Sequence, residues 1–289
     1  MSGPLAGLKV VELAGLGPTA FAAMMLADHG AEVIRVERPG TRPAERDPLL
    51  RSRKIVALDL KSGEGIEAVR ALSRDAHGFI EGFRPGTTER LGIGPDDLLR
   101  DNPKLVYGRL TGWGQDGPNA QLAGHDINYI ALTGALHAIG TAQTPVPPLA
   151  LLGDFAGGST MLAFGMVSAM LHAFRTGKGQ VVDCAMMDGA NVLMTIFHGL
   201  MAAGTWEDRR EANIVDGGAH WYGVYETRDN RFVSIASMEN QFYALLLERL
   251  GLSDDPEFAR TEDWLAVRKD KAQWPKLRQR LAALFRTRT

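Results

Sequence analysis

The chain has 289 residues, of which 45% are hydrophobic, and its formal net charge is −2. This length and apolar content suffice for one large core, or for a large domain with a smaller one beside it. A charge balance so close to neutral gives no bulk attraction to nucleic acid or to an anionic membrane. A polyanionic ligand would therefore need a local cluster of basic residues, and we expect no nucleic-acid partner.

Cysteine content and apolar segments indicate a cytoplasmic protein. Cys184 is the only cysteine, so an intrachain disulfide or a thiolate metal cage is excluded, which favours a reducing compartment. No basic neighbour activates it, and we expect an inert core thiol. The first apolar run is interrupted by Lys9 and Glu12 and does not resemble a signal peptide. The longest apolar stretch, residues 161–174, is too short for a membrane span, so no membrane insertion is predicted.

The first half of the chain alternates strand-like and helix-like segments. The predicted strands cover residues 8–13, 31–36, 78–81 and 104–110. The predicted helices cover residues 18–29 and 65–75. Such alternation is typical of a parallel sheet with helices on both faces. The predicted fold class is therefore α/β.

The second half changes character near residue 204. Before that point, helical segments are predicted at residues 126–140, 157–176 and 189–203, the second ended by Gly177. A charged run follows at residues 206–211, and then short strands and helices around residues 242–250 and 276–284. We predict a large domain over residues 1–203, a linker over 204–220 and a smaller domain over 221–289.

A glycine-rich turn follows the first predicted strand. Gly-Leu-Gly-Pro-Thr-Ala at residues 15–20 opens a helix, and Glu37 ends the next strand, as in a dinucleotide-binding fingerprint. The alternative is a plain strand-to-helix turn with Pro18 in the first helical turn. Pro18 removes an amide that would face a pyrophosphate, and Arg35 and Arg38 flank Glu37. The local field thus favours a phosphate over a bare ribose hydroxyl.

His125 lies in a short polar segment, Gly-His-Asp-Ile-Asn-Tyr at residues 124–129, between apolar runs. A lone histidine is more often structural than catalytic. His125 differs from the other six histidines because it precedes a segment that starts like a helix. The positive end of a helix dipole favours a neutral imidazole, which can act as a base.

Asp154 lies in a second polar segment, Gly-Asp-Phe-Ala-Gly-Gly at residues 153–158. It precedes the helix predicted from Gly157, so it could simply cap that helix. Capping does not require glycine at positions 153, 157 and 158, however. Glycines there would let a substrate approach the backbone and leave amides free to bind an oxyanion. An imidazole and a carboxylate in separate segments suit a site that removes a proton on one side and returns it on another.

These two segments, with Thr-Gly-Trp-Gly-Gln-Asp-Gly-Pro at residues 111–118, resemble the α-methylacyl-CoA racemases of the class III CoA-transferase family. The resemblance extends from residues 4–13 through Asn-Gln-Phe-Tyr at 240–243 to near the end of the chain. It implies a large parallel-sheet domain of Rossmann type, a smaller domain and an interlocked homodimer. Family members run further, so the resemblance also implies that the small domain over residues 221–289 is incomplete and the chain a shortened form.

The resemblance assigns roles to individual residues. His125 and Asp154 are the catalytic pair, and Glu239, from the small domain of the other subunit, orients the histidine; by itself Glu239 is an acid beside a helix start. Asp126 and Tyr129 are expected beside the catalytic pair or the CoA. The implied CoA contacts are Arg38, Leu58, Lys61, Gly82, Arg84, Arg90 and Tyr129. Arginine grips phosphate oxygens in pairs, although solvated surface charge is the alternative for each base.

The implied activity is epimerisation at C2 of 2-methylacyl-CoA thioesters by 1,1-proton transfer through an enolate, a step in fatty-acid metabolism. CoA is then part of the acyl-CoA substrate, and neither a separate cofactor nor a metal is expected. The family also performs CoA transfer, in which Asp154 would be the acyl-bearing nucleophile. An inactive shortened form is a third alternative. His125 favours the racemase, because transfer through a mixed anhydride does not require an imidazole opposite the carboxylate.

Overall fold

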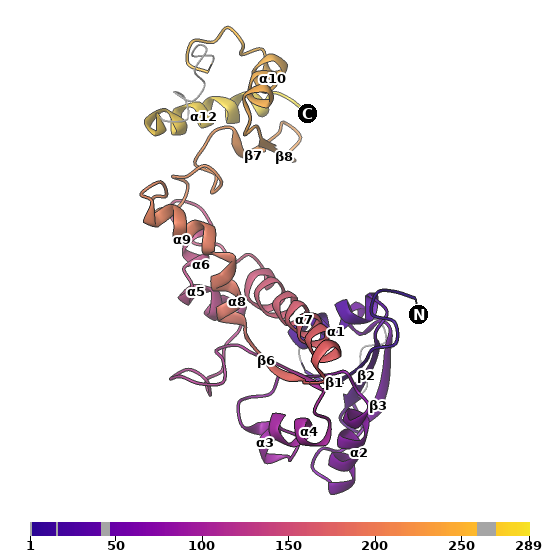
Figure 1. Cartoon of the computed structure of the whole chain (residues 1–289). Helices are drawn as coiled ribbons and strands as arrows, with labels where there is room; N and C mark the ends of the chain where they lie inside the picture. Colours follow the sequence, from indigo (N-terminus) through magenta and orange to yellow (C-terminus); the bar gives the residue numbers. More distant parts are fainter. Residues whose placement is uncertain (1, 16, 42–46, 259–269) are drawn as a thin grey trace. The chain divides into compact units, whose positions relative to one another are not determined.

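The computed structural model describes residues 2–15, 17–41, 47–258 and 270–289 (Figure 1). The chain forms two compact units. The large unit comprises Met1–Ala135 and Pro148–Thr195, and the small unit comprises Leu136–Pro147 and Ile196–Thr289. The division expected from the sequence, with a linker at residues 204–220, differs from these units in residues 136–147 and 196–203. Each unit is described by itself below.

The large unit is built on a six-stranded sheet of order β3-β2-β1-β4-β5-β6, in which all neighbours are parallel. Its strands are β1 (Lys9–Leu13), β2 (Glu32–Glu37), β3 (Arg53–Ala57), β4 (Gly78–Glu81), β5 (Val106–Thr111) and β6 (Gln180–Ala185). This is the order of a Rossmann-type doubly wound sheet. The predicted α/β fold class is therefore confirmed, and β3 and β6 are two strands that the sequence analysis missed.

Helices cover both faces of this sheet. They are α1 (Gly17–Asp28), α2 (Gly63–Arg74), α3 (Thr87–Arg90), α4 (Pro95–Asp101), α5 (Asp126–Leu132), α7 (Met161–Thr176) and α8 (Met186–Leu193). Successive strand residues point to opposite faces, so Val10 packs in a cluster with residues of α1 and α7, and Val11 packs in a cluster with residues of α2 and α4. Figure 1 shows α7 beside α1, in agreement with the first cluster.

Two predicted helices are each broken into shorter ones. The segment over residues 126–140 forms α5 and α6 (Ala135–Ala138), because Gly134, with φ +80°, ends α5. The segment over residues 189–203 forms α8, which starts three residues earlier than predicted, and α9 (Thr195–Ala202). Both predicted segments are thus helical, but each consists of two short helices and not of one.

The helix predicted over residues 157–176 begins six residues earlier than predicted, as the π-helix η2 (Leu151–Thr160), and continues into α7. Gly177, with φ +75°, ends α7, as predicted. Glycine disfavours helix, so propensity alone predicts a loop where η2 begins. The packing of η2 on α8 overrides it: a Cβ on Gly189 would lie 1.8 Å from the carbonyl oxygen of Gly157. The backbones of η2 and α8 are therefore in direct contact at Gly157 and Gly189.

Together η2 and α7 form 26 helical residues, long and apolar enough to cross a membrane by length and composition alone. This corrects the sequence-based view that the longest apolar segment is too short. A core helix passes the same test, and Leu162 and Met166 are fully buried in the large unit. Part of the apolar character of this helical segment is therefore explained by side chains that pack in the core of the large unit.

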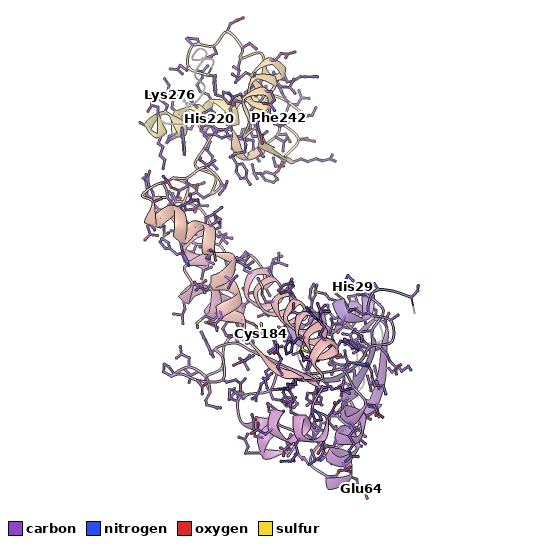
Figure 2. The ribbon with its side chains drawn as sticks, in the orientation of Figure 1. His29, Glu64, Cys184, His220, Phe242 and Lys276 are labelled. Carbon is purple, nitrogen blue, oxygen red and sulfur yellow. The ribbon has the colours of Figure 1, made fainter. Side chains whose placement is uncertain are left out.

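The small unit contains an antiparallel hairpin of β7 (Tyr222–Glu226) and β8 (Phe232–Ala236), with Tyr222 opposite Ala236. The described residues of the small unit also form the helices α10 (Asn240–Leu250) and α12 (Trp274–Phe285) and the 3-10 turn η3 (Lys271–Gln273), besides most of α6 and α9. Trp221 is buried in its core. The same core holds His220, labelled in Figure 2, whose Nε2 lies 2.9 Å from the hydroxyl of Tyr243.

The close contact of η2 with α8 predicts a large effect of one methyl group. Gly189→Ala should destabilise the protein by about 1–3 kcal/mol, because the new Cβ must displace backbone rather than a side chain. The matched control is Gly199→Ala in α9, where a Cβ has nothing within 4 Å and helix propensity favours alanine by about 0.5–1 kcal/mol. Thermal unfolding of both variants measures the contrast. A Gly189→Ala protein as stable as the wild type would refute the packing argument.

Candidate active site

A cavity of about 440 Å³ opens in the large unit where the chain leaves the carboxyl ends of three neighbouring strands. Pro18 and Thr19 follow β1, residues 82–85 follow β4, and residues 111–113 end or follow β5. The strand order reverses between β1 and β4. In open parallel sheets this switch point is where ligands bind. The topology therefore predisposes this cavity to be a binding site.

His125 lines this cavity from the start of α5. It is the exposed residue before the helix, with extended backbone, and its backbone N–H donates to Oδ1 of Asn128 at 3.0 Å. The prediction that His125 precedes a helix is confirmed. Its imidazole is accessible and lies at the positive end of a short helix.

Asp154 lines the same cavity and is half-buried. It lies inside η2 and not before a helix, which excludes the capping role considered from the sequence. The N–H groups of Gly153 and Asp154 donate to Oδ2 of Asp126, at 2.6 and 2.9 Å. The Gly153 amide is therefore not free to bind an oxyanion, contrary to the sequence-based expectation.

The other two glycines of this segment serve packing. A Cβ on Gly157 would lie 2.6 Å from the backbone nitrogen of Ala190, and one on Gly158 would lie 2.7 Å from the side chain of Met186. Both glycines are buried. Their small size thus lets η2 approach α8, which holds the turn that carries Asp154.

The pKa of Asp154 is raised from 3.8 to about 6. Burial is the largest cause, the negative charge of Asp126 adds to it, and the nearby His125 acts in the opposite direction. A carboxyl group with this pKa is present in both protonation states near neutral pH. It can therefore give or accept a proton at little free-energy cost.

Tyr129 supports the segment that precedes His125. Its hydroxyl donates to the carbonyl oxygen of Gly124 at 2.5 Å, and its ring packs edge-on against Trp113 at 4.8 Å. A Cβ on Gly112 would overlap this ring, at 2.3 Å. Tyr129 lines the cavity, but its hydroxyl is already bound to the loop. Burial, followed by the charges of Asp154 and Asp126, raises its pKa.

The residues expected to contact CoA, except Arg90, line two neighbouring cavities. Gly82 and Arg84 line the main cavity. A second cavity, of about 330 Å³, is lined by Arg38, Leu58 and Lys61. Phe83, which the sequence analysis did not single out, lines both.

Two expected site residues are not among those that line these cavities. Arg90 lines neither, and its guanidinium donates to Oγ1 of Thr87 at 3.1 Å. Glu239 belongs to the small unit, where it is the exposed residue that precedes α10 and makes no side-chain cap. The structure thus brings His125, Asp154 and Tyr129 to one cavity and leaves the role of Glu239 as an expectation.

Buried charges position the turn that carries Phe83. Oε2 of Glu81 accepts the N–H of Phe83 at 2.7 Å, and its Oε1 accepts from Nε of Arg109 at 2.9 Å. Arg109 also binds Glu89 of α3, with its Nη1 2.7 Å from Oε1. Sequence reasoning missed Glu81 and Arg109, although a charged residue inside an apolar strand was a visible signal. These contacts anchor both ends of the turn between β4 and α3.

Cys184, labelled in Figure 2, is an inert thiol, as predicted. It is buried, its Sγ donates to the carbonyl oxygen of Gly158 at 3.4 Å, and burial raises its pKa to about 12. A thiol with this pKa is not a nucleophile at neutral pH. Within the described ranges, no group of three or more His, Cys, Asp or Glu side chains could hold a metal ion.

Comparison with known proteins places the chain in a family. Residues 5–289 match CoA-transferase family III. The chain is 43% identical to the α-methylacyl-CoA racemase of Mus musculus and 42% identical to that of Homo sapiens, in each case over 99% of this chain and 72% of the relative. The crystal structure of Rv3272 from M. tuberculosis is similar, with a TM-score of 0.77 and 28% identity over 99% of this chain and 78% of the other. The chain therefore belongs to CoA-transferase family III.

Proposed function

We propose that this protein epimerises 2-methylacyl-CoA thioesters at C2 by 1,1-proton transfer. The observation that carries the proposal is that His125 and Asp154 line one cavity, while the pKa of Asp154 is raised to about 6. The identity to two proteins named α-methylacyl-CoA racemase supports the substrate class. Such a reaction belongs to fatty-acid metabolism, and the single cysteine favours a reducing compartment such as the cytoplasm. The burial of Leu162 and Met166 in the longest apolar helix favours a core helix over membrane insertion.

In the proposed mechanism, one member of the pair removes the proton from C2 of the bound thioester. The electrons of the broken C–H bond move into the C1–C2 bond and onto the thioester oxygen, which gives a planar enolate. The other member donates its proton to the opposite face of C2, and the thioester carbonyl re-forms. After the reaction, the member that acted as the base holds a proton and the member that acted as the acid has lost one. Proton exchange with water returns both groups to their starting states.

The pair must carry one proton in total for this reaction. In one direction His125 is the neutral base and Asp154 the acid; in the reverse direction His125 is the acid and Asp154 the base. Both arrangements hold the same number of protons, so both directions share one pH dependence. An aspartic acid with its ordinary pKa would be ionised at neutral pH and would rarely donate. The raised pKa of Asp154 increases the fraction of Asp154 that is protonated near neutral pH and can act as the acid.

We infer that the CoA part of the substrate lies across the two cavities. The second cavity offers Arg38 and Lys61 to the phosphates of the nucleotide end, and the main cavity offers Arg84 nearer to His125 and Asp154. Phe83, between them, would contact the connecting part of the ligand. This arrangement delivers the acyl thioester to the proton-transfer pair.

We further propose a homodimer in which Glu239 of the partner subunit orients His125. Within the large unit, Phe164, Val167, Leu171 and Phe174 of α7 are 38–72% exposed. Their spacing places them on one helix face. An exposed apolar face of this kind is a surface that a second subunit would cover.

CoA transfer is the second candidate function. The carboxylate of Asp154 lines a cavity and is half-exposed, so an acyl thioester can reach it as a nucleophile. In this route Asp154 attacks the thioester, which gives a mixed anhydride and releases the CoA thiolate; the thiolate then attacks the aspartyl carbonyl, which gives an aspartyl-CoA thioester and frees the 2-methyl acid. An acceptor acid takes the CoA from Asp154 by the reverse steps, and the hydrogen on C2 stays in place. The fate of that hydrogen therefore separates the two functions.

The first test uses a single-enantiomer 2-methylacyl-CoA in deuterated water. We expect the wild type to form the other epimer with deuterium at C2. His125→Ala and Asp154→Asn should each lower the rate about 100-fold or more, the usual scale of general acid–base catalysis. Proton NMR measures the deuterium at C2, and chiral analysis of the 2-methyl acid released by hydrolysis measures the ratio of the epimers.

The control for this test is His29→Ala. His29, labelled in Figure 2, is exposed, follows α1 and is not among the residues that line either cavity. It should retain wild-type exchange. Full exchange in His125→Ala would refute the racemase mechanism, and transfer of CoA to an added acid without exchange would establish the transferase instead.

A second test changes the charge beside Asp154. Asp126→Asn keeps an acceptor oxygen for the two amides but removes a negative charge that raises the pKa of Asp154. That pKa should fall below about 6 yet stay above 3.8, because burial persists. The acid limb of the pH–rate profile should therefore move to lower pH. An acid limb that stays in place would show that Asp154 does not titrate in the active pair.

A third test addresses CoA binding. Arg84→Ala and Lys61→Ala should each weaken the binding of free CoA in isothermal calorimetry, more strongly at low salt than at high salt. The matched control is Arg51→Ala, which removes an exposed arginine that pairs with Asp28 outside both cavities. If all three variants bind CoA like the wild type, the bases of the cavities are ordinary surface charges.

A further inference from the structure

A buried ion-pair network lies behind the second cavity. Arg35 of β2 is 5% exposed, and its Nε donates to Oε1 of Glu37 at 2.6 Å. Its Nη1 donates to Oε1 of Glu12 on β1, and its Nη2 lies 3.3 Å from the carbonyl oxygen of Gly15. Arg53 of β3 binds the other oxygen of Glu12, at 2.9 Å. Glu12 is therefore shared by two arginines, whereas Glu37 is bound by Arg35.

Glu37 occupies a distinctive position. It is the last residue of β2 and lines the second cavity. In dinucleotide-binding folds with this strand order, an acidic residue at this place binds the ribose hydroxyls, and a nearby arginine accommodates a phosphate on the ribose. Here Glu37 is 6% exposed and its carboxylate faces a buried arginine. The carboxylate is thus engaged from inside the protein.

The charge of the cavity wall depends on this contact. Among the residues that the structure describes, the ionisable ones of the wall are Arg38 and Lys61, which are positive, and Glu37 and Asp59, which are negative, so these four sum to zero charge. The guanidinium of Arg35 offsets the charge of Glu37 from behind. A ligand therefore meets a wall with one net positive charge. Glu12, which binds both Arg35 and Arg53, and Arg53 carry opposite charges that cancel, so these two residues leave the balance unchanged.

We propose that Arg35 is a specificity-determining residue: by neutralising Glu37 it makes the second cavity select a nucleotide with a phosphate on its ribose, the 3′-phosphorylated end of CoA, over the unphosphorylated form. The inference rests on the proposed function, because it takes CoA as the ligand. Arg35 acts through Glu37 and need not touch the nucleotide. The same residue thus turns an acid typical of NAD-binding folds into part of a phosphate site.

The test compares CoA with dephospho-CoA, which lacks only the 3′-phosphate, by calorimetry on a charge series. Glu37→Gln adds one positive charge to the wall, Arg35→Met removes one, and the double variant restores the wild-type total. We expect the preference for CoA over dephospho-CoA to rise about 3- to 10-fold in Glu37→Gln and to fall by a similar factor in Arg35→Met. The double variant should return close to the wild-type preference.

Lys54→Met is the matched control, because it removes one positive charge from an exposed pair with Glu32, outside this wall. It should leave the preference unchanged. If Arg35→Met does not fold, Glu37→Gln decides the question alone. An unchanged preference in Glu37→Gln would overturn the inference while CoA binding by the wild type persists. Wild-type protein that binds neither nucleotide would instead contradict the proposed function.

Discussion

The candidate site depends on one carboxylate that connects two helical segments. Asp126, the first residue of α5, is 4% exposed, and its Oδ2 accepts both the Gly153 and the Asp154 amides of η2. His125 directly precedes Asp126, so this contact sets the distance between the elements that carry the two proposed bases. The same carboxylate raises the pKa of Asp154 by its charge. Burial is the larger cause of the raised pKa of Asp154, and the carboxylate that fixes the position of Asp154 adds to it.

Close backbone packing makes this contact possible. The π-helix brings Asp154 to the cavity only because Gly157 and Gly189 let η2 and α8 approach with no side chains between them. On the other side of η2, the hydroxyl of Ser159 bonds to the carbonyl oxygen of Pro18 at 2.7 Å. The turn that carries Asp154 is therefore fixed to α1 as well as to α8. π-Helical turns are often retained at functional sites, where a side chain must be presented in an unusual register.

The sequence predicts the sheet and the place of His125 well, because strand alternation and helix starts are local signals. It predicts the turn around Asp154 poorly. The predicted helix starts at Gly157, whereas the observed helical segment starts at Leu151. Glycine disfavours helix, so nothing local indicates the earlier start, and the contact with α8 explains it. The edge strands β3 and β6 were missed because Arg53, Lys54 and Asp183 interrupt their apolar pattern. The charged residues Glu81 and Arg109 carried a signal of their function, since charges inside buried strands must be paired.

Buried charges at the strand ends distinguish this sheet from an ordinary dinucleotide-binding domain. Glu12 with Arg35 and Arg53, and Glu81 with Arg109, are ion pairs with little or no exposure. Removing such charges from water costs more than surface pairing returns, so stability alone does not explain them. Both networks end at residues that line a cavity, Glu37 in one and Phe83 in the other. We interpret these networks as preorganisation: they fix the shape and the charge of the two cavity walls before the ligand binds, which lowers the free-energy cost of binding.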